Sequence, residues 1–205
     1  MVTAQFVNIG ATSAISISDI VPTGDDTYNN VAIQTLDSAG RTLDNYVWTD
    51  AGGEGWDQIG WVNDDNEIVT GVSFEPGQGL WTYGSAVGQG VQIAGKVGTN
   101  DIVVQLCNGG TGTGNPFPVE VKIGDLVPSG DDCYNNVSIQ TLDSAGRTVD
   151  NYVWTDAGGE GWDQIGWVND DNEIVTDVQF SPGQGLWVFG SSTEQYLTFP
   201  APELK

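Results

Sequence analysis

Residues 19–84 read DIVPTGDDTYNNVAIQTLDSAGRTLDNYVWTDAGGEGWDQIGWVNDDNEIVTGVSFEPGQGLWTYG, and residues 125–190 repeat that stretch at an offset of 106 positions. The second copy reads DLVPSGDDCYNNVSIQTLDSAGRTVDNYVWTDAGGEGWDQIGWVNDDNEIVTDVQFSPGQGLWVFG. The copies differ only at positions 20, 23, 27, 32, 43, 71, 73, 75, 82 and 83 of the first. All eight tryptophans lie inside the copies. The duplication predicts two tandem units of one fold.

Strand signals dominate each copy. Residues 31–36, VAIQTL, alternate and are rich in β-branched side chains, and residues 42–48 form a natural return strand. The loop between them places Gly40 where a hairpin requires a positive φ. Short strands are expected at 56–62, 68–70 and 80–83, and no window has a helical period. The fold class predicted is all-β with little or no helix: two tandem β-sandwich-like repeat domains, 1–95 (core 19–84) and 96–205 (core 125–190).

The segments that flank the two copies are not equivalent. The apolar stretch Ile102–Leu106 precedes the second copy, and no residues before the first copy match it. Two interpretations follow: the matching strand belongs to a removed leader or an upstream domain, or the first repeat has an open sheet edge, which would be a docking site for another chain. We expect the two domains to pack through residues 90–118.

The charge of the chain restricts its partners. There are 28 acidic and 5 basic residues and no histidine among 205 residues, so the formal net charge is −23. Such a surface repels the phosphates of nucleic acids and anionic membranes, and no apolar run is long enough to span a bilayer. Acidity also simply keeps a protein soluble. No nucleic acid and no membrane insertion are expected.

Two acidic clusters in each copy offer oxygen ligands for calcium. Neither matches the known calcium loop with alternating acids, a central glycine and a terminal glutamate. The alternative is that Asp and Asn are turn residues on a solvated face. The candidate metal ligands are Asp25, Asp26, Asn29, Asn30, Asp64, Asp65, Asp131, Asp132, Asn135, Asn136, Asp170 and Asp171. Zinc is disfavoured, because the chain has no histidine and only two cysteines.

Tryptophans beside Asp, Asn and Gln suit stacking on sugar rings. The candidate ligand-binding residues are Trp56, Trp61, Trp162 and Trp167. The alternative is that tryptophans are large core residues, and at least two of the four in each copy should be core.

The sequence predicts no enzyme. Triads that need histidine are excluded, and no nucleophile elbow or phosphate loop is present. A paired-carboxylate glycosidase needs only two acids, but small β-domains offer little cleft.

The two cysteines, Cys107 and Cys133, predict a disulfide that ties the strand at 102–106 to the second repeat. A bridge across about 25 residues would add about 3 kcal/mol. It would also agree with an extracytoplasmic location.

The stretches PGQGLWTYG (76–84) and PGQGLWVFG (182–190), with the acidic Trp-containing segments before them, carry a family resemblance. The chain resembles uncharacterised secreted bacterial β-rich repeat proteins in which a Pro-Gly turn leads into a GLWV-type strand. The resemblance implies secretion behind a leader peptide and a repetitive β-rich fold, and it carries no functional residues across.

The function expected is therefore non-enzymatic. The leading hypothesis is an extracellular or cell-surface structural protein, a subunit of a self-assembling fibre, layer or matrix that calcium would stabilise. Self-association would be its main interaction, since head-to-tail contacts between matching surfaces propagate into filaments. The alternative hypothesis is a secreted carbohydrate-binding module that uses exposed tryptophans.

Overall fold

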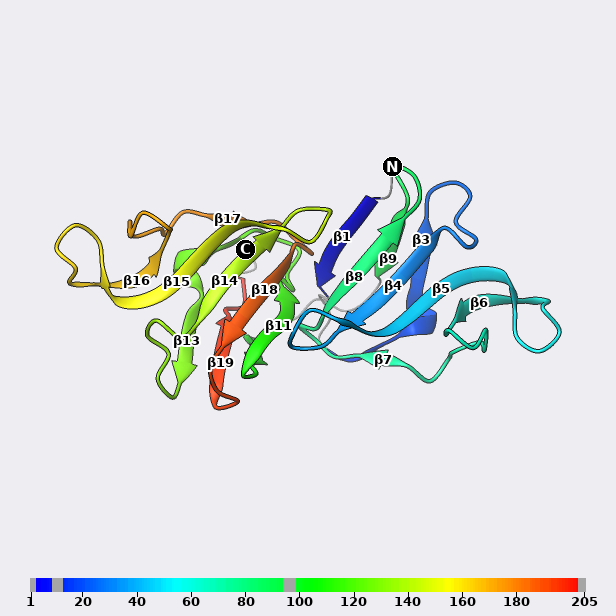
Figure 1. The fold of residues 1–205 in the computed structure, drawn as a ribbon, viewed down its shortest axis with the longest axis horizontal. Helices are drawn as coiled ribbons and strands as arrows, with labels where there is room; N and C mark the ends of the chain where they lie inside the picture. The colour runs from blue at the N-terminus through cyan, green and yellow to red at the C-terminus, as the bar shows by residue number, and fades with distance from the viewer. Residues whose placement is uncertain (1–2, 9–12, 94–98, 203–205) are drawn as a thin grey trace.

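The computed structural model describes residues 3–8, 13–93 and 99–202 and is all-β apart from two short 3-10 helices (Figure 1). Within these residues no helix is long and apolar enough to cross a membrane. The first repeat comprises β1 (Thr3–Asn8), β2 (Ile15–Ser16), η1 (Ile17–Asp19), β3 (Ile20–Thr23), β4 (Val31–Leu36), β5 (Thr42–Gly52), β6 (Gln58–Val62), β7 (Ser73–Phe74), β8 (Gly79–Gly84) and β9 (Gly90–Ile93). The second comprises β10 (Ile102–Gln105), β11 (Gly109–Gly114), β12 (Val121–Lys122), η2 (Ile123–Asp125), β13 (Val127–Gly130), β14 (Ser138–Leu142), β15 (Thr148–Gly158), β16 (Gln164–Val168), β17 (Gln179–Phe180), β18 (Gly185–Gly190) and β19 (Gln195–Phe199).

The two repeats use the same antiparallel topology. A five-stranded sheet has the order β1-β8-β4-β5-β6 in the first repeat and β11-β18-β14-β15-β16 in the second. A two-stranded sheet pairs β2 with β7 and, correspondingly, β12 with β17. The remaining small sheets differ, because among the described residues β3-β9 has two strands whereas β10-β19-β13 has three. The strand expected only in the second repeat is therefore present there as β10.

The hairpin between β4 and β5 forms as the sequence predicts. Along β4 the residues alternate between buried and partly buried, as a strand with one core face requires. The Asp37 carboxylate accepts the backbone N–H groups of Ala39 and Arg41 at 2.9 Å each, and Gly40 has a φ of +74°. The turn is thus fixed by a side-chain cap and by a glycine in the left-handed region.

The core of each repeat lies between its five-stranded sheet and its small sheets. In the first repeat the Trp61 indole N–H donates to the Ile20 carbonyl at 2.9 Å, and Tyr46 meets Phe74 edge to face. The second repeat repeats the indole bond between Trp167 and the Leu126 carbonyl at 2.7 Å. These contacts join β6 and β5 to the opposite layer and give each repeat a sandwich-like form.

Three strand predictions are corrected by the structure. The strand predicted at 42–48 continues to Gly52, because a register shift between Thr49 and Gly52 lets β5 stay paired with β6. The strand predicted at 56–62 begins only at Gln58, so Trp56 lies in the preceding turn. Residues 68–70 form no strand, and Ile68 makes only an isolated bridge to Val62.

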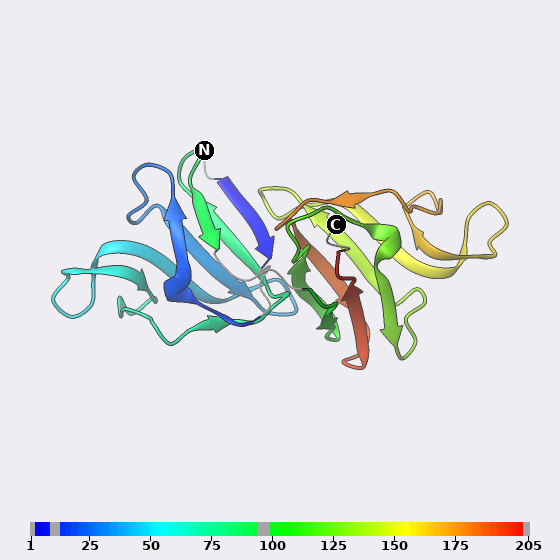
Figure 2. The same ribbon diagram turned by 180° about the vertical axis from the view of Figure 1, so that it is seen from behind.

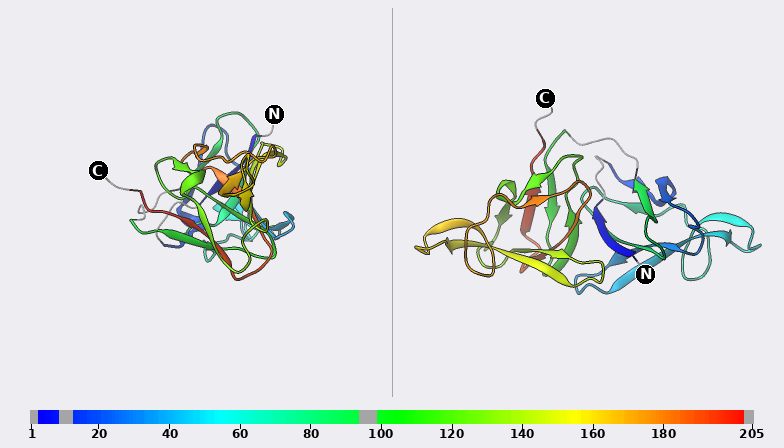
Figure 3. Two further views of the ribbon diagram at one scale, coloured as in Figure 1. Left: turned by 90° about the vertical axis from the view of Figure 1, so that its left-hand side faces the viewer. Right: turned by 90° about the horizontal axis from the view of Figure 1, so that it is seen from above.

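The two repeats lie side by side, with β1 and β8 of the first next to β11 and β18 of the second. The Ser38 carbonyl accepts the N–H of Gly110 at 2.8 Å, and the Thr113 hydroxyl donates to the Gly77 carbonyl at 2.7 Å. The sequence predicts that residues 90–118 join the two domains. Within that range β11 contacts β1 and β8 of the first repeat, and residues 94–98 lie outside the described residues. Viewed from behind and from above, the molecule is elongated, and the β5–β6 and β15–β16 loops lie at its opposite ends (Figures 2 and 3).

Candidate functional site

The first acidic cluster builds a turn between β3 and β4. Asp26 and Asn29 have positive φ values of 53° and 58°, which Asp and Asn tolerate better than most residues. The Asn30 amide donates to the Asp26 carbonyl at 2.8 Å. The Gln89 amide donates to the carbonyls of Asp25 and Asp26 at 2.8 and 2.9 Å. The Asn30 side chain and the backbone carbonyls of Asp25 and Asp26 are therefore hydrogen-bonded within the turn, and the second repeat reproduces these bonds with Asn136 and Gln195.

The second acidic cluster is an Asn-capped turn. The Asn63 side-chain oxygen accepts the N–H groups of Asp65 and Glu67 at 3.1 and 2.9 Å. Asp64 accepts the amide of Asn45 at 3.1 Å. Asp170 and Asp171 occupy the same places in the second repeat. In the described part of the chain no three His, Cys, Asp or Glu side chains converge on a common point. Calcium binding by these loops stays a prediction.

The tryptophans predicted to bind a ligand separate into two groups. Trp61 and Trp167 are buried, with 2% and 1% of their surface exposed, and belong to the cores. Trp56 and Trp162 are each 68% exposed and have φ values of +54° and +57°. A bulky residue in the left-handed region is unusual, and such conformations collect at functional sites. The sugar-stacking hypothesis therefore keeps only Trp56 and Trp162.

Each exposed tryptophan stands at an outer end of the molecule. It lies in the glycine-rich turn that connects the last two strands of the large sheet, and that sheet ends at β6 or β16. Ile59 and Ile165, three residues further on, are each 61% exposed. We call Trp56 with Ile59 the first tip and Trp162 with Ile165 the second tip. Exposed acidic residues lie next to the tip residues in sequence: Glu54 and Asp57 in the first repeat, and Glu160 and Asp163 in the second.

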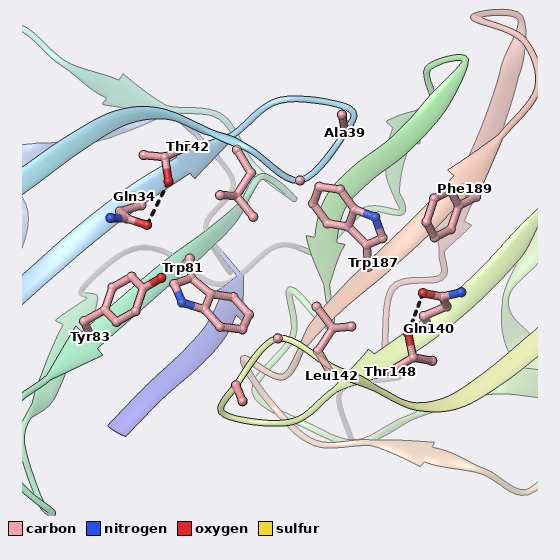
Figure 4. Close-up of a pocket in the computed structure, with 14 residues that line it drawn as sticks. Gln34, Ala39, Thr42, Trp81, Tyr83, Gln140, Leu142, Thr148, Trp187 and Phe189 are labelled. Carbon is pink, nitrogen blue, oxygen red and sulfur yellow. Dashed lines mark hydrogen bonds between the residues drawn. The ribbon is translucent and has the colours of Figure 1, made fainter. Parts of the chain in front are cut away.

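A cavity of about 430 Å³ lies where the two repeats meet (Figure 4). Seven residues of the first repeat line it, and the seven others are their counterparts 106 positions later. Trp81 faces the Gly146 turn of the second repeat, and Trp187 faces the Gly40 turn of the first. The first repeat contributes Gln34, Leu36, Ala39, Gly40, Thr42, Trp81 and Tyr83, and the second Gln140, Leu142, Ala145, Gly146, Thr148, Trp187 and Phe189.

The threonine hydroxyls of this cavity are paired with glutamines within each repeat. The Thr42 hydroxyl donates to Gln34 at 3.1 Å, and the Thr148 hydroxyl donates to Gln140 at 2.9 Å (Figure 4). Burial raises the pKa of the Tyr83 phenol. Each repeat packs a tryptophan on the glycine turn of the other repeat. The residues around this cavity therefore form a contact between the two repeats, which we call the joint. The sequence did not predict it, because nothing local in Gln34 or Trp81 indicates which strands become neighbours.

The hairpins of this joint are held by an Asp–Arg pair. Asp143 accepts Arg147 Nε at 2.8 Å, and the Arg147 hydrogen bonds hold the pKa of the Asp143 carboxyl at about 2, below its ordinary 3.8. Because the folded-state pKa is lowered, the stabilisation from this pair is full above pH 4 and is lost as the pH falls toward about 2.

We predict that the side-chain carboxyl carbon of Asp143 titrates in NMR with a midpoint near 2, and that Arg147→Gln moves the midpoint upward toward 3.8. Lys122→Gln, which removes a cation paired with a different carboxylate (Asp177), is the control and should leave the midpoint in place. An Asp143 midpoint that ignores Arg147→Gln would show that the guanidinium does not set this pKa.

The predicted disulfide is not formed, and Cys107 and Cys133 are free thiols in the structure. Each sulfur makes local contacts instead: Cys107 Sγ lies 3.2 Å from the Gly110 carbonyl, and Cys133 Sγ lies 4.0 Å from the Asp131 carbonyl. Burial, with the nearby Asp131 and Asp132 charges, raises the pKa of the Cys133 thiol. Spacing in sequence says nothing of whether two Cα atoms come within disulfide reach.

Comparison with known proteins adds no family to these observations. No family model, no curated protein and no solved structure matches the chain. The functional argument therefore rests on the residues and their geometry.

Proposed function

We propose that the protein is a non-enzymatic structural subunit that joins copies of itself end to end in an extracellular fibre, layer or matrix. One observation carries this proposal: the β5–β6 and β15–β16 loops lie at opposite ends of one elongated molecule (Figure 3), and each end carries the same exposed apolar pair, Trp56 with Ile59 or Trp162 with Ile165. A subunit with two identical adhesive ends forms open chains, because each contact leaves one end free on either side.

The expected contact between two tips is small. Four large apolar side chains would become buried, and an aromatic side chain buries about 150–250 Å². The total stays below the roughly 1,200–2,000 Å² of a standard stable interface. We therefore expect weak and reversible association that depends on protein concentration.

Electrostatic repulsion opposes this contact, so salt and calcium should control the association. The net charge is −23, and exposed acidic residues flank both tips in sequence. The Debye length, beyond which charges are largely screened from one another, falls from about 10 Å at 0.1 M salt to about 3 Å at 1 M. Added salt should therefore weaken the repulsion between tips and favour association. Calcium, which prefers carboxylate oxygens, should act at lower ionic strength by bridging the facing Glu54 and Asp57 side chains.

Sedimentation velocity tests the proposal. We predict that the average mass rises with protein concentration, rises further in 1 M salt or millimolar calcium, and returns to monomer with chelator when calcium was the agent. Magnesium chloride at equal ionic strength separates calcium bridging from screening. If assemblies formed in calcium persist after chelator is added, calcium does not bridge the subunits, and the apolar contact alone holds them together.

The second candidate function is carbohydrate binding by the exposed Trp56 and Trp162. The observation in its favour is the solvent-facing indole beside Asp57 and Gln58, a combination suited to stacking on a sugar and bonding its hydroxyls. A glycan array probed with the protein and with Trp56→Ala/Trp162→Ala discriminates the two functions. Hits that the double variant loses, from a protein that stays monomeric, would favour this candidate over assembly.

A further inference from the structure

The edge of β9 in the first repeat lacks the strand that covers the same edge in the second. β19 lies between β13 and β10, whereas its counterpart β9 pairs only with β3 among the described residues. The registers agree: Val127 and Pro128 face Thr198 and Leu197, while Val21 and Pro22 face Gln92 and Val91. The second repeat therefore shows the arrangement that the first would adopt if a further strand paired with the free edge of β9.

The backbone of β9 presents the same groups that bind β10 in the second repeat. The Leu106 N–H donates to the Gln195 carbonyl at 2.8 Å. Since backbone groups of alternate residues point the same way, Leu197 and Phe199 also face β10. Their counterparts, Val91 and Ile93, thus direct their N–H and C=O groups to the open side. Pro22 opposite Val91 agrees with this, because proline has no N–H to offer on the inner side.

The apolar side chains on β9 are less completely covered than those on β19. Leu197 and Phe199 are 0% exposed, but Val91 and Ile93 are only partly buried. Part of the difference comes from Leu106, which follows β10 and is itself 1% exposed inside the second core. Among the described residues, the core of the first repeat holds no counterpart of Leu106. Filling the edge would bury apolar surface as well as pair a strand.

Nothing in the sequence of β9 protects it against pairing. Natural edge strands commonly carry lysine, proline or inward-pointing charges that discourage another strand. The residues of β9 are Gly90, Val91, Gln92 and Ile93, none of which is charged or a proline.

We propose that β9 is a binding site for an extended segment of another polypeptide, which adds antiparallel to β3-β9 as β10 does to β13-β19. The chemistry of the segment follows from the register of β10, in which Ile102 faces Phe199 and Val104 faces Leu197. A β-branched apolar residue would face Ile93, a second would face Val91, and a leucine two positions further on would enter the core. The segment carries no excess negative charge, because the protein itself has a net charge of −23.

A synthetic peptide with the sequence of residues 99–106 and asparagine in place of Asp101, TNNIVVQL, with capped ends, tests this site without adding negative charge. The titration uses full-length Trp56→Ala/Trp162→Ala protein, so that association through the tips does not interfere and the outcome is independent of the proposed function. We expect one peptide per chain, a dissociation constant of about 1 mM or tighter, and NMR shifts at the amides of Gly90–Ile93.

Two N-methylated peptides provide the matched control. Methylation of the nitrogen equivalent to Val104 removes an N–H that faces β9 and should weaken binding at least tenfold. Methylation at the position of Val103 alters an N–H that faces outward and should leave binding within about twofold. A protein variant with Val91→Asp should also lose binding, with circular dichroism confirming its fold. Absence of binding at millimolar peptide, equal binding of the two methylated peptides, or shifts confined to β10 would each overturn the proposal.

Discussion

Trp167→Ala should destabilise the second repeat by about 3–5 kcal/mol, the usual cost of deleting a large buried aromatic side chain. The indole is 1% exposed, packs edge to face on Trp154 at 5.4 Å between ring centroids, and donates to the Leu126 carbonyl. The substitution therefore leaves a cavity and also removes the partner of a buried carbonyl. Trp61→Ala should cost the first repeat a similar amount.

Denaturant unfolding followed by far-ultraviolet circular dichroism measures this effect. Trp162→Ala is the matched control, because it deletes the same side chain five residues away at a position that is 68% exposed. We expect its free energy of unfolding to stay within about 0.5 kcal/mol of the parent. Equal destabilisation by Trp162→Ala and Trp167→Ala would contradict the assignment of one tryptophan to the surface and the other to the core.

Trp56→Ala alone should convert open chains into dimers, and Trp56→Ala/Trp162→Ala should leave monomers. The reason is the identity of the two tips: with one removed, each molecule keeps a single adhesive end, and two such molecules cap each other. Trp162→Ala alone should give the same dimers. This stepwise change distinguishes end-to-end assembly from non-specific hydrophobic association, which would weaken gradually as each exposed side chain is removed.

Mass photometry or sedimentation velocity in 1 M salt counts the species. The control is Leu43→Ser/Val149→Ser, a matched pair of exposed apolar residues at the start of β5 and β15, 64% and 61% exposed. That variant should assemble like the parent. Chains that persist in Trp56→Ala would mean that the first tip is not a contact, and loss of chains in the Leu43→Ser/Val149→Ser variant would move the contact elsewhere.

The fold was largely predictable, because its decisive signals are local. Val31–Leu36, the capped turn at Asp37 and the positive φ at Gly40 follow from alternation and turn chemistry, and all are present. The extra strand of the second repeat was also visible, since Ile102–Leu106 has no match before the first copy. The extension of β5 to Gly52 was missed, because it depends on a bulge that pairing with β6 stabilises.

The candidate site was predictable only in part. Trp56 and Trp61 both flank one short predicted strand, and their sequence surroundings do not say which is exposed. Strand alternation does not separate them, because Trp56 lies in the turn before β6, and Ile59, at the same strand parity as the buried Trp61, is 61% exposed. The joint formed by Trp81 and Trp187 depends on how two sheets meet, and whether Cys107 and Cys133 pair depends on the tertiary structure around them. Neither is encoded within one segment of sequence.

Electron microscopy of the purified protein tests the central claim most directly. Grids are prepared at low salt, at high salt, and with calcium before and after chelator. We predict linear chains in high salt and in calcium, with a repeat that matches the long axis of one molecule, and mostly single particles at low salt. Dispersed monomers under every condition would contradict assembly through the tips and leave carbohydrate binding by Trp56 and Trp162 as the function to test.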